Sequence, residues 1–317
     1  MFRNKKAIVI FSFIFITLLV IVIIFLKKTN SNKLSDDSLI NNEELLSFGK
    51  YKKTTKIDKL TRSYTLYIPH SYLNNESLPL IIALHPEGVT GEEFADFTKL
   101  SQVNSQENFI LITPDAIKNE WSDGRKIKEN NQSLPDDVKF ISTLIDEAIQ
   151  KYNVNKGKIF VTGFSSGGIM TLRLACELSD KINAVAIVGA TFPKDYFKLC
   201  QPINAVPIII INSTNDNIIP YQGGKIISDL ITGETESNDN TIDFWVNNNG
   251  CKPDPTEYIF GNNPLTHIER EDYQGGDAVT LYQVVGGAHS WPLGINTGQD
   301  INATDLIWKF FKNGSSY

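Results

Sequence analysis

The sequence predicts a three-layer α/β domain with a mostly parallel central sheet. Short apolar segments typical of strands take turns along the chain with longer amphipathic segments typical of helices, and this is the order found in such domains. Several strand segments are apolar without alternation, as expected for strands covered on both faces. The 317 residues show no internal repeat and no second domain.

The elements follow one another in a regular order. Strands are expected at residues 63–68, 78–84, 109–112, 158–162, 184–188, 207–211 and 279–285. Helices are expected at residues 93–103, 136–152, 168–178, 224–231, 241–247 and 303–312. The helix of residues 136–152 has the clearest pattern, because its apolar residues recur at the spacing of one helix face and Pro135 suits a first turn.

The N-terminal region precedes this domain. Residues 7–26 are uncharged throughout, and a helix of about 20 such residues spans the roughly 30 Å core of a bilayer. We expect residues 1–28 to be a transmembrane signal anchor, because Lys27 follows the apolar run without a small-residue cleavage site. The alternative is a cleaved signal peptide.

A polar linker is expected at residues 29–50, followed by the folded domain at residues 51–317. The stretch of chain before the apolar segment is very short, and such a stretch normally stays in the cytoplasm. The folded domain is therefore expected outside the cytoplasm. It would be anchored to the membrane, or secreted if the segment is cleaved.

Charge and cysteine content exclude several classes of function. The formal net charge is −6, but residues 1–33 hold six basic and no acidic residues, which leaves 24 basic against 36 acidic residues elsewhere. Such an acidic body is not expected to bind nucleic acid. The three cysteines suit an exported protein with one disulfide and one spare thiol, and they lack metal-ligand spacing. The sequence therefore predicts neither a metal nor another cofactor.

The strongest motif is Gly163-Phe164-Ser165-Ser166-Gly167-Gly168, which fits the G-x-S-x-G pattern between an expected strand and an expected helix. A strand that enters a helix through a strained turn needs small residues two positions before and after the serine, where a Cβ would clash. The motif is typical of α/β-hydrolases and predicts Ser165 as a nucleophile. The alternative is a chance match in a Gly- and Ser-rich loop.

A serine hydroxyl requires a base, and in α/β-hydrolases the chain order is serine, acid, histidine. His289 follows the expected strand 279–285 in a glycine-rich loop and is the predicted base, whereas His267 falls within an outer strand. Asp216 follows strand 207–211 and is the predicted acid, which would hold the tautomer of His289. A plain turn role for Asp216 stays open, and the other acidic candidates are Asp243, Asp254 and Asp272.

The oxyanion hole is expected from two backbone N–H groups. One belongs to Ser166, directly after the nucleophile, and the other to the loop that follows strand 78–84. In that loop Pro86 has no N–H, so Glu87 is the expected second donor.

Five segments together resemble the extracellular polyhydroxybutyrate depolymerase and feruloyl esterase family. The resemblance extends from about Arg62 to Trp291 and implies an α/β-hydrolase fold with Ser165, Asp216 and His289 as the triad of a serine carboxylic ester hydrolase. Its substrate would be a polyester, a feruloylated or acylated polysaccharide, or a small ester. The segments are Leu84-His85, Trp121-Ser122-Asp123-Gly124-Arg125, Asp136-Asp137-Val138, Thr214-Asn215-Asp216 with Pro220-Tyr221-Gln222-Gly223-Gly224, and Gly287-Ala288-His289-Ser290-Trp291-Pro292.

The resemblance also bears on residues around the site. It implies that Trp121 and Trp291, together with His85, contact the substrate, although burial in the core is the commoner fate of a tryptophan. Where relatives often pair the cysteine at position 251 with a later one, this chain has none. We therefore expect Cys176 to pair with Cys200, with three reduced thiols as the alternative.

The chain departs from the family at two places. Pro86 stands where the family usually has glycine, and Asn212-Ser213 stands where it usually has His-Gly. These departures favour a rival interpretation, a membrane-tethered binding module that has lost its chemistry, whereas the intact Ser, Asp and His set argues against it. A serine peptidase of the same fold is the second rival.

Overall fold

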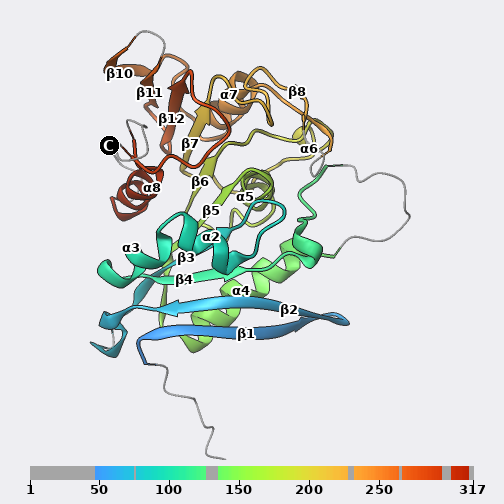
Figure 1. Ribbon diagram of the computed structural model, residues 1–317, viewed down its shortest axis with the longest axis vertical. Coiled ribbons are helices and arrows are strands. Elements are labelled where there is room, and N and C mark those ends of the chain that lie inside the picture. The colour runs from blue at the N-terminus through green and yellow to red at the C-terminus, as the bar shows by residue number, and fades with distance from the viewer. Residues whose placement is uncertain are drawn as a thin grey trace, which may run out of the picture. The chain divides into compact units, whose positions relative to one another are not determined.

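A ten-stranded sheet forms the centre of the computed structural model, in the order β1-β2-β4-β3-β5-β6-β7-β12-β11-β10 (Figure 1). The neighbours from β4 to β12 pair in parallel, and the pairs at both edges are antiparallel. The structure describes residues 47–74, 76–125, 135–227, 232–263, 266–294 and 301–313. The mostly parallel sheet confirms the predicted fold class.

The strands of this sheet are short and, at its centre, buried. All residues of β4, β6 and β7 are buried, which explains why their sequences are apolar without alternation. Their bounds are β1 Gly49–Ile57, β2 Leu60–Ile68, β3 Leu78–Leu84, β4 Ile110–Pro114, β5 Val154–Phe164, β6 Ala184–Val188, β7 Ile208–Ser213, β10 Thr256–Asn263, β11 Thr266–Tyr273 and β12 Val279–Val285. A separate two-stranded sheet joins β8 Gly224–Lys225 to β9 Glu234–Thr235.

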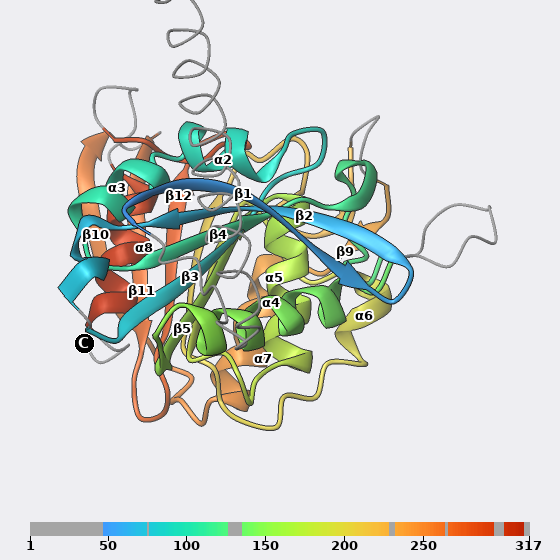
Figure 2. The same cartoon turned by 90° about the horizontal axis from the view of Figure 1, so that it is seen from below.

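Helices cover both faces of the sheet (Figure 2). One face packs against α4 Asp137–Lys151, α5 Ser166–Glu177 and α7 Asn238–Asn248. The other packs against α2 Gly91–Phe97, α3 Leu100–Gln106 and α8 Ala303–Lys312. Among the described residues, three short helices lie in connecting loops, namely α6 Lys194–Phe197 and the 3-10 helices His70–Asn74 and Ile117–Asn119. The expected three layers are therefore present.

Two expected helices differ from the structure. The helix expected at residues 93–103 is divided into α2 and α3, because Lys99 adopts a left-handed backbone with φ of 64° that interrupts the helix. The prediction of a helix at residues 224–231 is wrong for residues 224–227, the part that the structure describes. Gly224 has φ of 107° and pairs with Thr235 in β8–β9, so an extended pair replaces the first turn.

The expected membrane anchor, residues 1–28, lies outside the described residues, and so does most of the expected linker. β1 begins at Gly49, inside the stretch expected as linker. Within the part of the chain that the structure describes, no helix combines the length and apolar character that a membrane span needs.

A disulfide joins Cys176 to Cys200 with their Cα atoms 5.2 Å apart, and this confirms the expected pairing. It connects the last turn of α5 to the loop that follows α6. Cys251 is a free, partly exposed thiol whose Sγ lies 3.1 Å from the carbonyl oxygen of Asp277.

A buried ion pair ties β2 to α4. Arg62 Nη2 donates to Asp137 Oδ1 at 2.6 Å, and both side chains are almost fully enclosed. The second carboxylate oxygen of Asp137 accepts from the N–H of Ser122 at 2.7 Å and from its hydroxyl at 2.9 Å. The pair therefore fixes the loop that contains Trp121 and Ser122 against the start of α4.

At the opposite edge of the sheet, β10 presents apolar side chains to solvent. Tyr258 is 44% exposed, Ile259 69% and Phe260 45%. β10 pairs with β11 on one side only, because it is the last strand of the sheet.

Candidate active site

The turn after β5 holds Ser165 in a strained backbone. Its φ is 55° and its ψ is −122°, a region that residues with a Cβ rarely occupy. The two flanking glycines permit this turn: a Cβ on Gly163 would lie 2.2 Å from the carbonyl oxygen of Gly167, and one on Gly167 would lie 2.1 Å from that of Leu84. The predicted elbow therefore has the steric basis that the sequence pattern requires.

The predicted acid and base follow strands that end at the same edge of the sheet as β5. At this edge Leu84 of β3 is aligned with Gly163 of β5, and Phe164 of β5 with Val188 of β6. β7 and β12 continue this parallel arrangement. The loops at their carboxyl ends, where α/β sheets place their ligand sites, contain Asp216 and His289.

Asp216 and His289 are bonded to each other. His289 Nδ1 lies 2.6 Å from Asp216 Oδ2, and the two side chains are 12% and 4% exposed, respectively. The other oxygen, Asp216 Oδ1, accepts the N–H groups of Ile218 and Ile219, both at 2.8 Å. Because the carboxylate accepts from Nδ1, the imidazole Nε2 is left free to receive a proton.

The ring of His289 lies directly beside the elbow. It stacks on Phe164, the residue before Ser165, with ring centroids 4.8 Å apart and planes at 26°. Gly189 lies beside both rings, since a Cβ added to it would stand 2.9 Å from Phe164 Cε2 and 3.3 Å from His289 Cε1. Sequence reasoning missed both neighbours. The signal for Gly189 was its place directly after the apolar strand 184–188.

Asn212, one of the two departures from the family, is fully paired in the structure. Its Nδ2 donates to the carbonyl of Ala190 at 2.9 Å and to Asn238 Oδ1 at 2.8 Å, and its Oδ1 accepts the Ala190 N–H at 3.1 Å. These two hydrogen bonds to the backbone of Ala190 hold the turn that contains Gly189. The asparagine thus supports the backbone against which His289 packs.

The first expected oxyanion donor is at the start of a helix. Ser166 is the first residue of α5, and the first N–H groups of a helix have no intrahelical partner. The positive end of the helix dipole lies at the same place and favours negative charge.

The second expected donor is in the loop after β3. Neither Glu87 nor Gly88 donates its N–H to another backbone group among the described residues. This loop touches the elbow, because the carbonyl oxygens of Leu84 and His85 are the atoms nearest a Cβ on Gly167. Both expected donors therefore come from segments in direct contact.

The expected substrate contacts of His85, Trp121 and Trp291 need correction. All three side chains are buried, with exposures of 0%, 1% and 2%. Trp121 Nε1 donates to the carbonyl of His85 at 2.8 Å, and Trp291 Nε1 donates to Thr304 Oγ1 at 3.0 Å. These side chains brace the loops around the site from within the core, so they are not the walls that meet a substrate.

Glu87 carries a carboxyl group with a perturbed pKa. Its Oε2 is buried and has no hydrogen-bond partner within the described residues. Burial raises the pKa of Glu87 from 4.5 to about 7, and nearby Glu120 and Asp123 act in the same direction. The positive charge of Arg125 acts in the opposite direction, but its effect on the pKa of Glu87 is smaller than that of burial. The guanidinium of Arg125 is itself paired with Asp123 at 2.6 Å.

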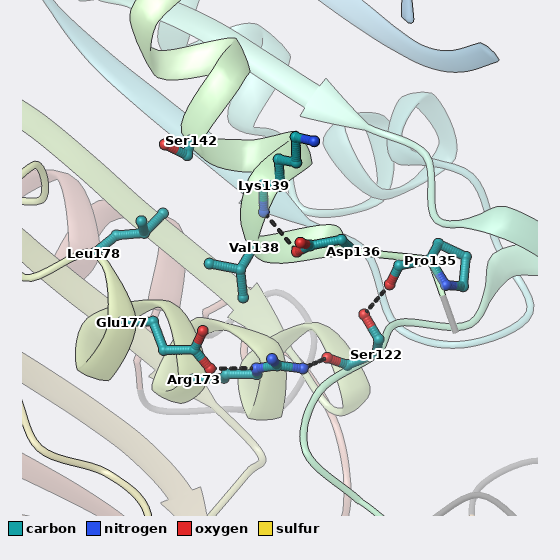
Figure 3. Close-up of a pocket in the computed structure, with 9 residues that line it drawn as sticks. All are labelled: Ser122, Pro135, Asp136, Val138, Lys139, Ser142, Arg173, Glu177 and Leu178. Carbon is teal, nitrogen blue, oxygen red and sulfur yellow. Dashed lines mark hydrogen bonds and ion pairs between the residues drawn. The ribbon is translucent and has the colours of Figure 1, made fainter. Parts of the chain in front are cut away.

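A cavity of about 540 Å³ lies between α4 and α5, away from these groups (Figure 3). Its one arginine is paired within the lining, since Arg173 Nε contacts Glu177 Oε1 at 2.7 Å and Arg173 Nη1 donates to the carbonyl of Ser122. None of the predicted site residues lines it. Elsewhere in the described ranges, no three His, Cys, Asp or Glu side chains are grouped to hold a metal ion.

Comparison with known proteins places the chain among esterases. Residues 74–244 match the phospholipase/carboxylesterase family. The chain is 27% identical to a probable feruloyl esterase C of Aspergillus niger, over 79% of this chain and 83% of that protein. It is 26% identical to feruloyl esterase B of Piromyces equi, over 72% of this chain but only 42% of that protein.

Solved structures show the same fold. The acetyl xylan esterase from Aspergillus awamori gives a TM-score of 0.57 at 18% identity, over 83% of this chain and 99% of that chain. The resemblance expected from the five segments is therefore confirmed for its feruloyl esterase branch and for the α/β-hydrolase fold.

The contact between Gly189 and His289 yields a first prediction. In Gly189→Ala the new Cβ displaces Phe164 or His289, so the rate at which a fluorophosphonate labels Ser165 should fall roughly tenfold to 10²-fold. The matched control is Gly250→Ala, which has a similar φ of 71° but no neighbour within 4 Å. Both variants carry the same type of backbone strain, so equal labelling rates in the two would contradict this role of Gly189.

The raised pKa of Glu87 yields a second prediction. Between pH 4.5 and about 7 the unfolded chain has lost the Glu87 proton while the folded chain retains it, so stability falls as the pH rises through this window. Relative to the parent, Glu87→Gln should gain stability across that window and show no further change above it. Urea unfolding at a series of pH values measures the difference.

Glu93→Gln is the control of opposite sign. The backbone N–H of Thr90 lowers the pKa of Glu93, so this carboxylate contributes stability above pH 4.5 that is lost as the pH falls further. If the parent and Glu87→Gln gave parallel curves from pH 4 to 8, the assignment of a buried, protonated Glu87 would be wrong.

Proposed function

Since the chain belongs to the phospholipase/carboxylesterase family and is a serine carboxylic ester hydrolase of the α/β-hydrolase fold, we propose that Ser165, Asp216 and His289 are its catalytic triad. The observation that carries this proposal is the 2.6 Å contact between His289 Nδ1 and Asp216 Oδ2, beside a serine with φ of 55°. Strain of this kind, persisting in a well-packed turn, is concentrated at functional sites.

The proposed reaction proceeds through an acyl-enzyme. His289 Nε2 takes the Ser165 proton as Oγ attacks the ester carbonyl, and the same proton then passes to the departing alcohol. Water, activated by His289 in the same way, releases the acid and restores the serine. Asp216 stays ionised throughout, because its tasks are to fix the tautomer and to stabilise the imidazolium.

The oxyanion of each tetrahedral intermediate would lie between the N–H groups of Ser166 and Glu87. Donors that are already oriented before the reaction stabilise charge without any reorganisation, and the loss of one typically costs about 10² to 10³ in rate. The contact of Gly167 with the carbonyls of Leu84 and His85 supports this pairing of donors.

For the substrate we propose feruloyl or acetyl esters of plant polysaccharide, ahead of hydroxyalkanoate polyesters. The support is the set of feruloyl esterases at 25% to 27% identity over about four fifths of this chain. The two departures do not favour the rival binding module, because Asn212 is fully paired and the carbonyl of Pro86 is hydrogen-bonded to the buried ring of His85.

We further propose that residues 7–26 anchor the enzyme, with its catalytic domain outside the cytoplasm. The support is the uncharged run itself and the disulfide between Cys176 and Cys200, a bond that persists in oxidising compartments. The expected result is that the full chain sediments with membranes and that protease added to intact cells digests the domain. A chain recovered in the cytosol with both thiols reduced would overturn this location.

The triad is tested by substitution in the full-length chain. Ser165→Ala and His289→Ala should abolish fluorophosphonate labelling and lower the kcat for p-nitrophenyl acetate by about 10⁴ or more, and Asp216→Asn should lower it by about 10⁴. Asp243→Asn, in the surface of α7, is the control. Retention of labelling in Ser165→Ala, or an equal loss in Asp243→Asn, would refute the assignment.

The same parent enzyme ranks the substrates. Values of kcat/KM for methyl ferulate, p-nitrophenyl acetate and 3-hydroxybutyrate oligomers separate the three acyl classes, and we expect the first two to exceed the third. If the enzyme is labelled at Ser165 but prefers hydroxybutyrate oligomers, the proposed triad stands and the proposed substrate is wrong.

A further inference from the structure

The loop that should supply the second oxyanion donor is bound from behind by His85. The side chain of His85 is fully buried, and the ring makes two hydrogen bonds. Nε2 lies 3.0 Å from the backbone nitrogen of Ala116, and Nδ1 lies 2.7 Å from the carbonyl oxygen of Pro86.

These two bonds determine where the ring proton is. The Ala116 group is a backbone N–H and can only donate, so Nε2 must be the unprotonated acceptor. The proton of the neutral ring is then on Nδ1 and is donated to the Pro86 carbonyl. Burial lowers the pKa of His85, which keeps the ring neutral at ordinary pH.

The Pro86 carbonyl shares a peptide unit with the Glu87 N–H. Described peptide bonds are all trans, and in a planar trans peptide the C=O and the N–H point in opposite directions. Once Nδ1–H holds the carbonyl on the core side, the Glu87 N–H must point away from the core. That N–H donates to no backbone acceptor in the described part of the chain.

We propose that His85 is a positioning residue that aims the Glu87 N–H at the oxyanion, by donating from Nδ1 to the carbonyl of the same peptide unit. The inference rests on the proposed function, since it assumes that Ser165 forms a tetrahedral intermediate. A donor hydrogen bond to the carbonyl also polarises the peptide and strengthens its N–H as a donor.

The surroundings keep this peptide unit in one orientation. Trp121 Nε1 donates to the carbonyl of His85 at 2.8 Å, and the centroids of the indole and imidazole rings are 4.9 Å apart. Pro86 contributes a φ fixed near −65° by its ring. Proline in place of the usual glycine therefore stiffens the loop. Because proline has no N–H, this position also adds no backbone donor that would need a partner.

Two substitutions separate the two hydrogen bonds of His85. In His85→Asn the amide nitrogen takes the place of Nδ1, which keeps the donor to Pro86 and loses the acceptor for Ala116. In His85→Gln the amide oxygen takes the place of Nε2, which keeps the acceptor for Ala116 and loses the donor to Pro86. Each variant loses one buried hydrogen bond, so urea unfolding should show similar stability losses.

The expected result is a difference in kcat alone. His85→Gln should lower kcat for p-nitrophenyl acetate by at least tenfold, towards the 10² to 10³ typical of a lost oxyanion donor, with KM nearly unchanged. It should also weaken inhibition by a trifluoromethyl ketone by a similar factor. His85→Asn should keep kcat within about threefold of the parent, because it retains the donor. Equal losses in both variants, or a larger loss in His85→Asn, would overturn the proposal.

A measurement on the parent chain covers the case in which neither variant folds. Pro86-Glu87 is the one Pro-Glu pair in the sequence, so a chain with 13C-carbonyl proline and 15N-glutamate gives a single correlated amide signal, that of Glu87. Labelling Ser165 with a fluorophosphonate places an oxyanion mimic in the site, and the Glu87 amide proton should then shift downfield.

This measurement also separates the two proposals. If the label attaches to Ser165 and the Glu87 signal does not move, the role of His85 is refuted while the triad stands. If no label attaches, the triad itself has failed. Imidazole 15N shifts that place the proton of His85 on Nε2 would refute the proposal independently.

Discussion

The contact between two backbones at the turn after β5 is the constraint on which the site depends. Gly163 and Gly167 allow this turn to close against the carbonyl of Leu84, at distances where a Cβ could not be placed. The closure forces Ser165 into its strained backbone and sets the first turn of α5 beside the loop after β3. One steric condition thus positions the nucleophile and both expected oxyanion donors, and the parallel strands β7 and β12 need only add the acid and the base.

Much of this could be predicted from the sequence because the relevant signals are local. Strands 78–84, 184–188 and 279–285 match the structure to the residue. The first two are continuous apolar runs, as expected for strands covered on both faces, and the third is mostly apolar but includes Thr280 and Gln283. Asp216 and His289 each follow such a strand, and the carboxyl ends of neighbouring parallel strands meet at one edge. Chain order and strand ends were therefore enough to select two residues that the structure shows bonded.

Long-range contacts account for what could not be predicted. The burial of Trp121 and Trp291 depends on partners at His85 and Thr304, which are distant in sequence. The left-handed backbone of Lys99 ends a helix pattern that shows no break in the sequence. Likewise, the sequence suggested that Asn212 weakens the site, because its hydrogen-bond partner Ala190 follows a different strand and the sequence does not show that they meet. In each case a hydrogen bond or backbone angle set by tertiary packing overrides a local pattern.

Because β10 is an edge strand with exposed apolar side chains, we expect self-association of this enzyme to increase with protein concentration. A strand with free backbone groups and apolar side chains is a template for pairing with another chain, and Ile259 is the most exposed of its three large apolar residues. Protein concentration therefore becomes an experimental variable. The dilute solution of a kinetic assay and the concentrated solution of a crystallisation drop can hold different colloidal species of the same chain.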